Sequence, residues 1–311
     1  GENLPDGDRM KTALVTGATG FIGSHIAEAL VSQGWRVICI DNMKTGKYEN
    51  LRPWFNRNTC ELHVADVSEY SAIVQYFPGV DVVFHNAASK CTVCREDPKT
   101  DLLVNALGTM NVCHAAIENG VKKVIHASTG SVNDIRSYYG NSKMAGETYL
   151  KVVKEYHPYF NYTVLRYHHV YGPRQDDSDK GGVIPIFIRN IYCGNPVTIF
   201  GDGEQVRHFT HVSDIVRANL WAAENPVTDG KTYNVLSDVT CTINELASDL
   251  MRLMGRDVPT VYAPAKQGDI RTFTATAEKI KADGFVFREN FNDGLKDTIQ
   301  WYCRKWERKA A

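Results

Sequence analysis

Short β-branched runs alternate with longer amphipathic stretches along the first half of the chain. Buried parallel strands form short apolar runs, and their crossover helices carry apolar residues at helical spacing, so this alternation predicts βαβ units and a parallel sheet. The predicted strands are Ala13–Thr16, Arg36–Ile40, Glu61–Val64, Val82–His85, Lys123–Ala127 and Thr163–Arg166. The helices predicted between them are Phe21–Gln33, Tyr70–Phe77, Leu102–Asn119 and Tyr139–Tyr156.

The pattern changes after Arg174. A loop rich in Asp and Gly (175–182) leads into shorter elements separated by Gly and Pro, and a closing helix is predicted near Leu295–Trp306. We expect an α/β fold: a Rossmann-type doubly wound parallel sheet over residues 10–172 and a smaller C-terminal α/β substrate lobe over 173–311. Part of 205–236 is expected to return to the Rossmann sheet, and residues 1–9 to be a flexible lead or an expression remnant.

The chain is almost neutral, with 35 basic and 36 acidic residues among 311. That balance gives no electrostatic attraction to nucleic acid or to an anionic membrane. No apolar run approaches the roughly 20 residues that span a bilayer, and the start lacks the apolar core of a signal peptide. The eight cysteines include one close pair, Cys91 and Cys94, without a second pair to complete a zinc site. We expect a cytoplasmic protein with reduced thiols, no metal, and no nucleic-acid or membrane partner.

Three glycines follow the first predicted strand at regular spacing, as Gly17, Gly20 and Gly23, at a strand-to-helix junction. Glycine lets the backbone turn tightly and approach a pyrophosphate, and the following helix offers free N–H groups and the positive end of its dipole. The pattern favours a dinucleotide site. An ordinary glycine-rich turn remains the alternative for this motif on its own.

Asp41 ends the second predicted strand, 24 residues after Gly17. A carboxylate at this position accepts hydrogen bonds from the adenosine ribose and repels the 2′-phosphate of NADP. No arginine follows immediately to bind that phosphate, so we expect NAD. Asp66, after the third strand, is placed either for the adenine edge or to cap the helix that begins near Tyr70.

Tyr139 and Lys143 are four residues apart at the start of a predicted helix and therefore share a face. An ammonium beside a phenol stabilises the phenolate, which makes tyrosine usable as a general acid/base at neutral pH. Tyr138 lacks such a partner, because Ser142 stands at the same spacing. Upstream, Thr129 follows a strand end where a hydroxyl can hold a reacting oxygen. The alternatives are an exposed helical pair and a simple strand-end hydroxyl.

Several segments together resemble the extended short-chain dehydrogenase/reductases, in particular their nucleotide-sugar epimerase and dehydratase branch. They are TGATGFIGSHI, Asp41-Asn42, HNAAS, Asn105, AST, YGNSK, LRY…YGPR and GDGEQVRHFTHV, and the resemblance runs from about Lys11 to Trp306. It implies a homodimer that pairs the helices Leu102–Asn119 and Tyr139–Tyr156, and a catalytic set of Thr129, Tyr139 and Lys143. It also implies NAD contacts from Gly17, Gly20, Phe21, Ile22, Gly23, Asp41, Asn42, Met43, Lys44, Thr45, Gly46, Asp66, Val67, Asn86, Ala87, Ala88, Ser89, Lys90, Asn105, Tyr139, Lys143, Tyr167 and His168.

The resemblance implies a nucleotide-diphosphate sugar as substrate, most readily a UDP-sugar. The implied substrate contacts are Thr129, Tyr139, His169, Val183, Phe200, Arg207, Lys266, Asp269 and Phe273. His169 stands where the family usually has Asn, and a histidine can titrate near neutrality. Lys266 stands where arginine is common and would attract phosphate as a point charge. For Phe200 and Phe273, ordinary core packing is the alternative.

The residues after Thr129 bear on the type of reaction. Dehydratases and decarboxylases of this branch usually carry an acidic residue there, whereas this chain has Gly130 and Ser131. This favours a 4-epimerase, in which a transient 4-keto sugar is reduced back and NAD is regenerated. The segment from Thr129 to Tyr139 spans only ten positions, fewer than the family usually has. The alternatives are a nucleotide-sugar dehydratase or reductase, an NAD(P)-dependent dehydrogenase of another alcohol, and a protein that holds NAD without catalysis.

Overall fold

The computed structural model describes residues 9–54, 58–90, 92, 94–265 and 274–310. The chain divides into two compact units. Unit 1 comprises Gly1–Arg166 and Val216–Tyr233, and unit 2 comprises Tyr167–Ile215 and Asn234–Ala311. The chain therefore leaves unit 1, returns to it for residues 216–233, and leaves it again.

Unit 1 is built on a seven-stranded sheet with the order β11-β6-β5-β4-β1-β2-β3. The pairs β2–β3, β1–β2, β1–β4 and β4–β5 are parallel. The order 3-2-1-4-5-6 is that of a Rossmann sheet, to which β11 adds a further strand, so the predicted fold class is confirmed. The strands are β1 (Thr12–Thr16), β2 (Arg36–Asp41), β3 (Cys60–Val64), β4 (Val82–His85), β5 (Lys123–Thr129), β6 (Asn161–Tyr167) and β11 (Lys231–Val235).

The register brings functional strand ends to one edge of this sheet. Thr16 pairs with Ile40 on β2 and with His85 on β4. The turn after β1, Asp41 and the loop after β4 therefore lie at the same carboxyl edge. Ligands of open α/β sheets bind at that edge.

The helices of unit 1 follow the predicted pattern with one substantial difference. The helix expected over Leu102–Asn119 is divided into α3, a π-helical segment η4 and α4, and α3 starts earlier, with Pro98 at its first position and Asp97 as its cap. The expected helix over Tyr70–Phe77 is a short α-helix followed by a 3₁₀ turn. The helices are α1 (Phe21–Ser32), α2 (Tyr70–Ile73), α3 (Pro98–Leu102), α4 (Gly108–Glu118), α5 (Tyr138–Tyr156) and, across the unit boundary, α7 (Val212–Glu224).

Short 3₁₀ and π segments connect these elements. They are the 3₁₀ turns η1 (Tyr48–Asn50), η2 (Arg52–Trp54), η3 (Val74–Tyr76), η5 (Gly130–Asn133) and η6 (Pro226–Thr228) and the π-helical η4 (Leu103–Leu107).

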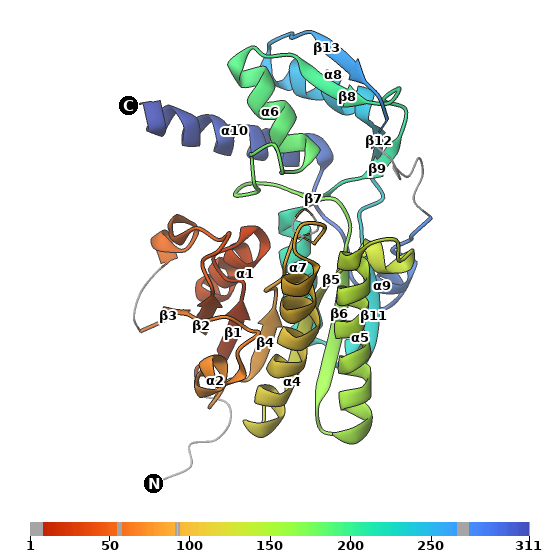
Figure 1. Cartoon of the computed structure of the whole chain (residues 1–311). Helices are drawn as coiled ribbons and strands as arrows, with labels where there is room; N and C mark the ends of the chain where they lie inside the picture. Colours follow the sequence, from red (N-terminus) through yellow and green to blue (C-terminus); the bar gives the residue numbers. More distant parts are fainter. Residues whose placement is uncertain (1–8, 55–57, 91, 93, 266–273, 311) are drawn as a thin grey trace. The chain divides into compact units, whose positions relative to one another are not determined.

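Alternate residues of the strands form the core of unit 1. Leu14, Ile38 and Val83 point to the same face and pack with buried residues of the helices, among them Val112 on α4 and Leu150 on α5. Figure 1 shows α4 and α5 lying over the sheet. This face of the sheet and the apolar faces of the two helices therefore bury one another.

Unit 2 has its own core and three two-stranded sheets. These pair β10 with β7 and β13 with β8 in parallel and β12 with β9 antiparallel. Helix α8 begins at a capping box formed by Thr242 and Glu245 and ends at Gly255 in the left-handed conformation. The elements are β7 (Val170–Tyr171), α6 (Val183–Cys193), β8 (Val197–Phe200), β9 (Val206–His208), β10 (Thr210–His211), β12 (Thr240–Thr242), α8 (Ile243–Met254), β13 (Thr260–Ala263), α9 (Glu278–Ala282) and α10 (Phe291–Ala310).

Within the described part of the chain, every helix is too short or too polar to cross a bilayer. The cysteines that the structure describes are all free thiols.

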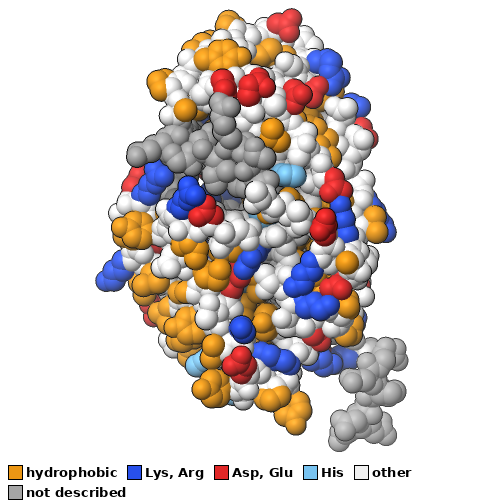
Figure 2. All heavy atoms as spheres, turned by 90° about the vertical axis from the view of Figure 1, so that its right-hand side faces the viewer, with side chains coloured by type: hydrophobic (Ala, Val, Ile, Leu, Met, Phe, Trp, Pro, Cys, Tyr) orange, Lys and Arg blue, Asp and Glu red, His pale blue; other side chains and the backbone are white. Residues whose placement is uncertain are grey.

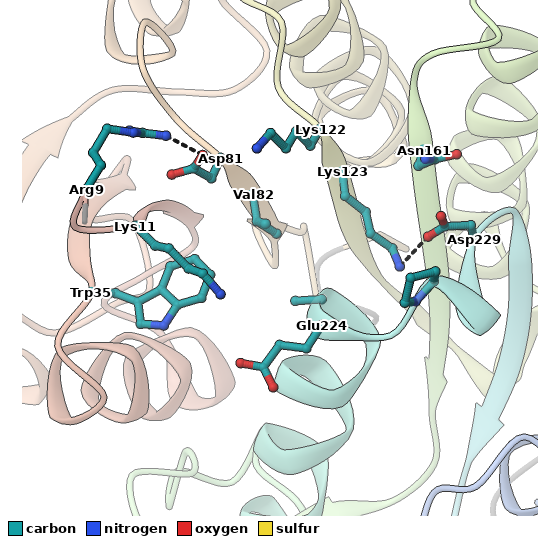
Figure 3. Close-up of a pocket in the computed structure, with 12 residues that line it drawn as sticks. Arg9, Lys11, Trp35, Asp81, Val82, Lys122, Lys123, Asn161, Glu224 and Asp229 are labelled. Carbon is teal, nitrogen blue, oxygen red and sulfur yellow. Dashed lines mark hydrogen bonds and ion pairs between the residues drawn. The ribbon is translucent and has the colours of Figure 1, made fainter. Parts of the chain in front are cut away.

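A buried lysine closes unit 1 at the opposite, amino edge of the sheet. Lys123, the first residue of β5, borders a hollow of about 450 Å³ and is 6% exposed. Its Nζ donates to the carbonyl of Ala222 at 2.7 Å and to Thr228 Oγ1 at 2.7 Å, and it pairs with Asp229 Oδ1 at 2.6 Å. Figure 3 shows the Lys123–Asp229 pair on one side of this hollow. The returning segment 216–233 is thus tied to the sheet through one ammonium group.

We predict that Lys123→Met destabilises the protein by about 2–4 kcal/mol, because it leaves Asp229 without its ion-pair partner and removes the buried hydrogen bonds of the ammonium. Lys122→Met at the exposed neighbouring position is the matched control and should change stability by less than about 0.5 kcal/mol. Chemical denaturation at pH 7 measures both. Equal midpoints for the two variants would contradict the anchoring role.

Candidate cofactor and catalytic site

The turn after β1 is held so tightly that only glycine fits. Gly17 has φ +65°, and a Cβ there would lie 2.8 Å from the backbone nitrogen of Ala87. A Cβ on Gly23 would lie 2.2 Å from the carbonyl oxygen of Gly17. Helix α1 starts after Gly20, which has no side chain to cap it, and its first turn carries no acidic residue. Its N–H groups and its positive dipole end therefore suit an anionic group such as a pyrophosphate.

Asp41 connects this turn to the loop after β2. The carboxylate is 8% exposed, and it accepts from Thr19 N at 3.0 Å and from Met43 N at 2.9 Å. Met43 has φ +59°, an uncommon left-handed conformation for a residue other than glycine. A Cβ on Gly46 would lie 1.8 Å from Thr19 Oγ1, so the loop 42–46 packs directly on the glycine turn. Each carboxylate oxygen of Asp41 keeps a lone pair for a ribose hydroxyl.

Asp66 is fixed by its neighbours in the same region. It accepts from Asn42 Nδ2 at 2.8 Å and from Ser68 N at 3.0 Å. Partial burial opposes its ionisation, but the hydrogen bonds from Asn42 and Ser68 and the charge of Lys44 lower its pKa overall. The capping alternative for Asp66 is wrong, because the N-cap of α2 is Glu69.

The next residue, Val67, is a core residue, 3% exposed. Its carbonyl accepts from Asn111 Nδ2 at 2.9 Å. A contact from Val67 to a cofactor would therefore come from its backbone.

The loop after β4 contains a buried hydroxyl that could bind a ligand. Ser89 is 9% exposed, and its N–H donates to Asn105 Oδ1 at 2.9 Å. Its Oγ has no hydrogen-bond partner among the described residues. Ala88 and Lys90 on either side are exposed. A buried hydroxyl without a partner is costly unless a bound group or water satisfies it.

Lys143 is a buried ammonium on α5, 2% exposed, one turn after Tyr139. Its Nζ donates to the carbonyl of Ala127 on β5 at 2.5 Å. Burial lowers the pKa of Lys143 to about 8, against the opposing charges of Glu147 and Asp101. Tyr138, the rejected alternative, is 60% exposed. The predicted pair thus joins a half-buried tyrosine to a buried charge on the same helical face.

Thr129 ends β5 beside the start of α5. Its side chain caps the 3₁₀ turn η5 by accepting from Ser131 N at 3.3 Å. A Cβ on Gly140 would lie 2.9 Å from the carbonyl oxygen of Ser131, so the first turn of α5 packs on the segment that follows Thr129. The short segment between Thr129 and Tyr139 is therefore compact.

Two buried histidines near this site were not predicted from the sequence. His85 and His126 pair in register on β4 and β5, and their ring centroids are 5.3 Å apart. Thr109 Oγ1 donates to the carbonyl of Asn105, so it must accept from His85 Nε2–H, which leaves His85 Nδ1 to accept from Thr16 Oγ1 at 2.7 Å. Burial and the charge of Lys143 lower the pKa of His85 to about 3. The same causes lower the pKa of His126.

The remaining predicted residues that are described belong to unit 2. His169 has φ +38°, a strained conformation at a candidate site. Desolvation and the cationic Arg207 lower the pKa of His169 to about 3, whereas the surface of the residue is exposed, so its titration near neutrality stays a prediction. Arg207 on β9 is 9% exposed. Tyr167 ends β6, and His168 follows it. Val183 begins α6, and Phe200 ends β8 with 38% of its surface exposed. Lys266, Asp269 and Phe273 lie outside the described residues.

Comparison with known proteins identifies the family. The model of the NAD dependent epimerase/dehydratase family matches residues 13–235. The chain belongs to this family. The resemblance found in the sequence is thereby confirmed, and NAD is the cofactor.

Relatives in the epimerase/dehydratase family match over almost the whole chain. A putative UDP-glucose 4-epimerase of Methanocaldococcus jannaschii is 30% identical over 305 residues, covering 93% of this chain and 97% of the relative. A UDP-N-acetyl-alpha-D-glucosaminuronate decarboxylase of Bacillus cytotoxicus is 33% identical, covering 94% and 98%. The crystal structure of UDP-glucose 4-epimerase from Thermotoga maritima with UDP-glucose superposes with a TM-score of 0.88 at 33% identity, covering 95% and 99%. These names include more than one reaction at similar identity.

The geometry of unit 1 fits NAD. The backbone-filled glycine turn and the uncapped start of α1 suit the pyrophosphate, and Asp41 suits the adenosine ribose. The unsatisfied Ser89 hydroxyl offers one further polar contact. His85 and His126 are neutral beside Lys143, so they add no positive charge at the carboxyl edge of the sheet.

We predict that the buried His126 makes stability pH-dependent. Its pKa is lowered on folding, so between the unfolded value near 6.5 and the folded value only the unfolded chain binds the proton, and stability falls as pH falls. His126→Leu should reduce the loss of stability between pH 7 and pH 5 by roughly 2 kcal/mol. His114→Gln, at an exposed position on α4, should keep the wild-type pH dependence. Chemical denaturation at both pH values measures the slopes, and an unchanged slope in His126→Leu would refute the prediction.

Proposed function

We propose that this chain epimerises a nucleotide-diphosphate sugar, most readily a UDP-sugar at C4, through a transient 4-keto intermediate. The observation that carries the proposal is the buried ammonium of Lys143 one turn from Tyr139 at the end of β5. Tyr139 takes the proton from the sugar hydroxyl and returns it, and Lys143 stabilises the phenolate between these steps. Thr129 holds the reacting oxygen. When bound, NAD supplies a reversible hydride acceptor.

The surroundings of Thr129 support an epimerase over a dehydratase or decarboxylase. Gly130 and Ser131 follow it in η5, and neither can move a second proton. Asp134, the first acidic residue after Thr129, is exposed and forms an ion pair with Arg136 at 2.8 Å. The site as described therefore offers one acid/base residue, which suits return of the hydride to the same carbon.

The substrate class rests on unit 2 and on the relatives. Arg207 supplies a positive charge that is 9% exposed, and we assign it to the diphosphate. Val183 and Phe200 are further candidate contacts in the same unit, and His169 would donate or accept a hydrogen bond. The Thermotoga maritima relative holds UDP-glucose, which favours a UDP-sugar here.

The function is tested with a panel of UDP-, dTDP-, CDP- and GDP-sugars, with products identified by mass and NMR. A product of unchanged mass and inverted C4 supports the proposal. Loss of water or of carbon dioxide would assign the chain to the dehydratases or decarboxylases. Turnover of a simple alcohol with net reduction of NAD would assign it to the dehydrogenases.

We predict that Tyr139→Phe lowers turnover of the nucleotide-sugar by about 10² to 10⁴, because it removes the acid/base hydroxyl. NAD affinity should change little, since the glycine turn, Asp41 and Lys143 remain. Tyr138→Phe is the matched control on the neighbouring exposed ring and should retain wild-type turnover. Near-wild-type turnover by Tyr139→Phe would exclude the mechanism.

We propose a homodimer through the α3–α5 face of unit 1. Large apolar side chains are exposed there, at Leu102 (52%), Tyr149 (41%) and Val152 (40%). Figure 2 shows hydrophobic side chains gathered on the lower half of the face it presents. Contiguous exposed apolar patches are typical of interfaces.

We predict a dimer mass in light scattering at micromolar concentration and a shift toward monomer in Val152→Glu, because a charge would be buried in the interface. Val261→Glu, at an exposed position in unit 2, is the control. A monomeric wild-type protein would rule out the dimer.

A further inference from the structure

Asp101, an acidic residue not identified from the sequence, lies near the proposed catalytic residues. Asp101 is in α3, 1% exposed, and its Oδ1 accepts from Asn105 Nδ2 at 3.0 Å. Carboxylates are rarely buried to this extent unless their charge is compensated, because desolvation is costly. Asp97, one turn earlier on the same helix, is exposed and caps it. The two acids of α3 therefore have different environments and different roles.

The Asn105 amide makes three hydrogen bonds that a flipped amide could not make. Its Oδ1 accepts from Ser89 N at 2.9 Å, and its Nδ2 donates to Asp101 Oδ1 and to Ser142 Oγ at 3.0 Å. A carboxylate can only accept, so Asp101 holds the NH₂ end and directs the oxygen toward the Ser89 N–H. The orientation of this amide is thus set by the Ser89 N–H at one end and by the Asp101 carboxylate at the other.

Asn105 connects the loop after β4 to the first turn of α5. Ser89 lies in the loop after β4, and Ser142 Oγ donates to the carbonyl of Tyr139 at 3.1 Å in the first turn of α5. The packing is close, since a Cβ on Gly146 would lie 3.0 Å from the carbonyl oxygen of Asn105. Asn105 belongs to the π-helical segment η4, and such segments are frequent at functional sites.

Asp101 also contributes charge beside Lys143. The titratable groups that face the Lys143 ammonium are Glu147 on α5, Asp101 on α3, His85 on β4 and His126 on β5. Both histidines are neutral at pH 7, because burial lowers their pKa.

Glu147 is already neutralised. Arg166 on β6 donates to both of its carboxylate oxygens, with Nη2 at 2.7 Å, and Ser128 Oγ donates to it at 2.5 Å. Burial raises the pKa of Asp101, while the Ser142 hydroxyl and Lys143 oppose that shift. Both carboxylates face Lys143, and Glu147 has the larger effect on its pKa. Asp101 accepts from the neutral Asn105 amide and Ser142 hydroxyl, whereas Glu147 is also paired with Arg166.

We propose that Asp101 is a positioning residue for the reaction: it fixes the Asn105 amide that ties the loop after β4 to the first turn of α5, and it places a buried negative charge facing the Lys143 ammonium. The proposal rests on the function proposed above. Tyr139 then works beside an ammonium whose pKa, already lowered by burial, is kept from falling further by this charge. Without that charge, Glu147 would be the remaining carboxylate that opposes the desolvation of Lys143.

The test compares Asp101→Asn with Asp97→Asn in the NAD-loaded protein. Asp101→Asn keeps the size of the side chain but removes its charge, so the titration midpoint of Lys143, followed by the ¹³Cε signal that Lys143→Met abolishes, should fall by about one pH unit or more. The alkaline limb of kcat should move to lower pH by the same amount, with KM changed less than about twofold. Asp97→Asn should leave both midpoints at the wild-type pH.

The two readouts separate the inference from the proposed function. The Lys143 titration needs no substrate, so a moved midpoint supports the role of Asp101 even if no nucleotide-sugar is turned over. A folded Asp101→Asn protein with the wild-type Lys143 midpoint and pH profile overturns the inference. If Asp101→Asn does not fold, the smaller neutral variant Asp101→Ser takes its place with the same expectations and the same refuting result.

Discussion

The burial of one ammonium group constrains much of unit 1. Lys143 lies almost entirely out of solvent, and a buried charge is tolerated only where opposite charges and hydrogen-bond acceptors surround it. The carbonyl of Ala127 provides the acceptor, and Glu147 provides a carboxylate that Arg166 holds from β6. Arg166 in turn donates to Asn133 Oδ1 at 2.8 Å, in the segment after Thr129. The positions of α5, the end of β5 and the end of η5 are thereby linked to one another.

Most of the fold of unit 1 follows from local sequence signals. The predicted strands fall within the observed ones, because buried parallel strands leave continuous apolar runs between turn residues. The glycine turn could be predicted because regularly spaced glycines stand between a predicted strand and a predicted helix. The structure gives the steric reason: a Cβ on Gly17 or Gly23 would collide with neighbouring backbone atoms. Tyr139 and Lys143 could be paired from their spacing alone, since residues four positions apart on a helix share a face.

What the sequence did not reveal depends on contacts between distant residues. The π-helical segment interrupts an apolar pattern that reads as one continuous helix, and its position is set by the buried Asn105 amide. His85 and His126 occur in separate apolar strands, and only the register of β4 and β5 places them opposite each other. The available signal was a histidine in each of two predicted buried strands. The strand order was needed to infer that the two histidines are neighbours. The role of Asp101 likewise requires knowing that α3 packs against α5.

The short segment between Thr129 and Tyr139 bears on the chemistry because its one acidic residue, Asp134, points to the surface. Thr129 caps its first turn and Ser137 caps α5 at its end, so both termini of the segment are fixed by side-chain hydrogen bonds. Asp134, its acidic residue, is drawn to Arg136 at the surface. A segment so constrained has little freedom to bring a second carboxylate to the reacting carbon. In the function proposed above, proton transfer then falls to Tyr139 beside the buried charge of Lys143. This arrangement favours a reaction in which one hydroxyl proton and the hydride of the same carbinol carbon are taken and then returned.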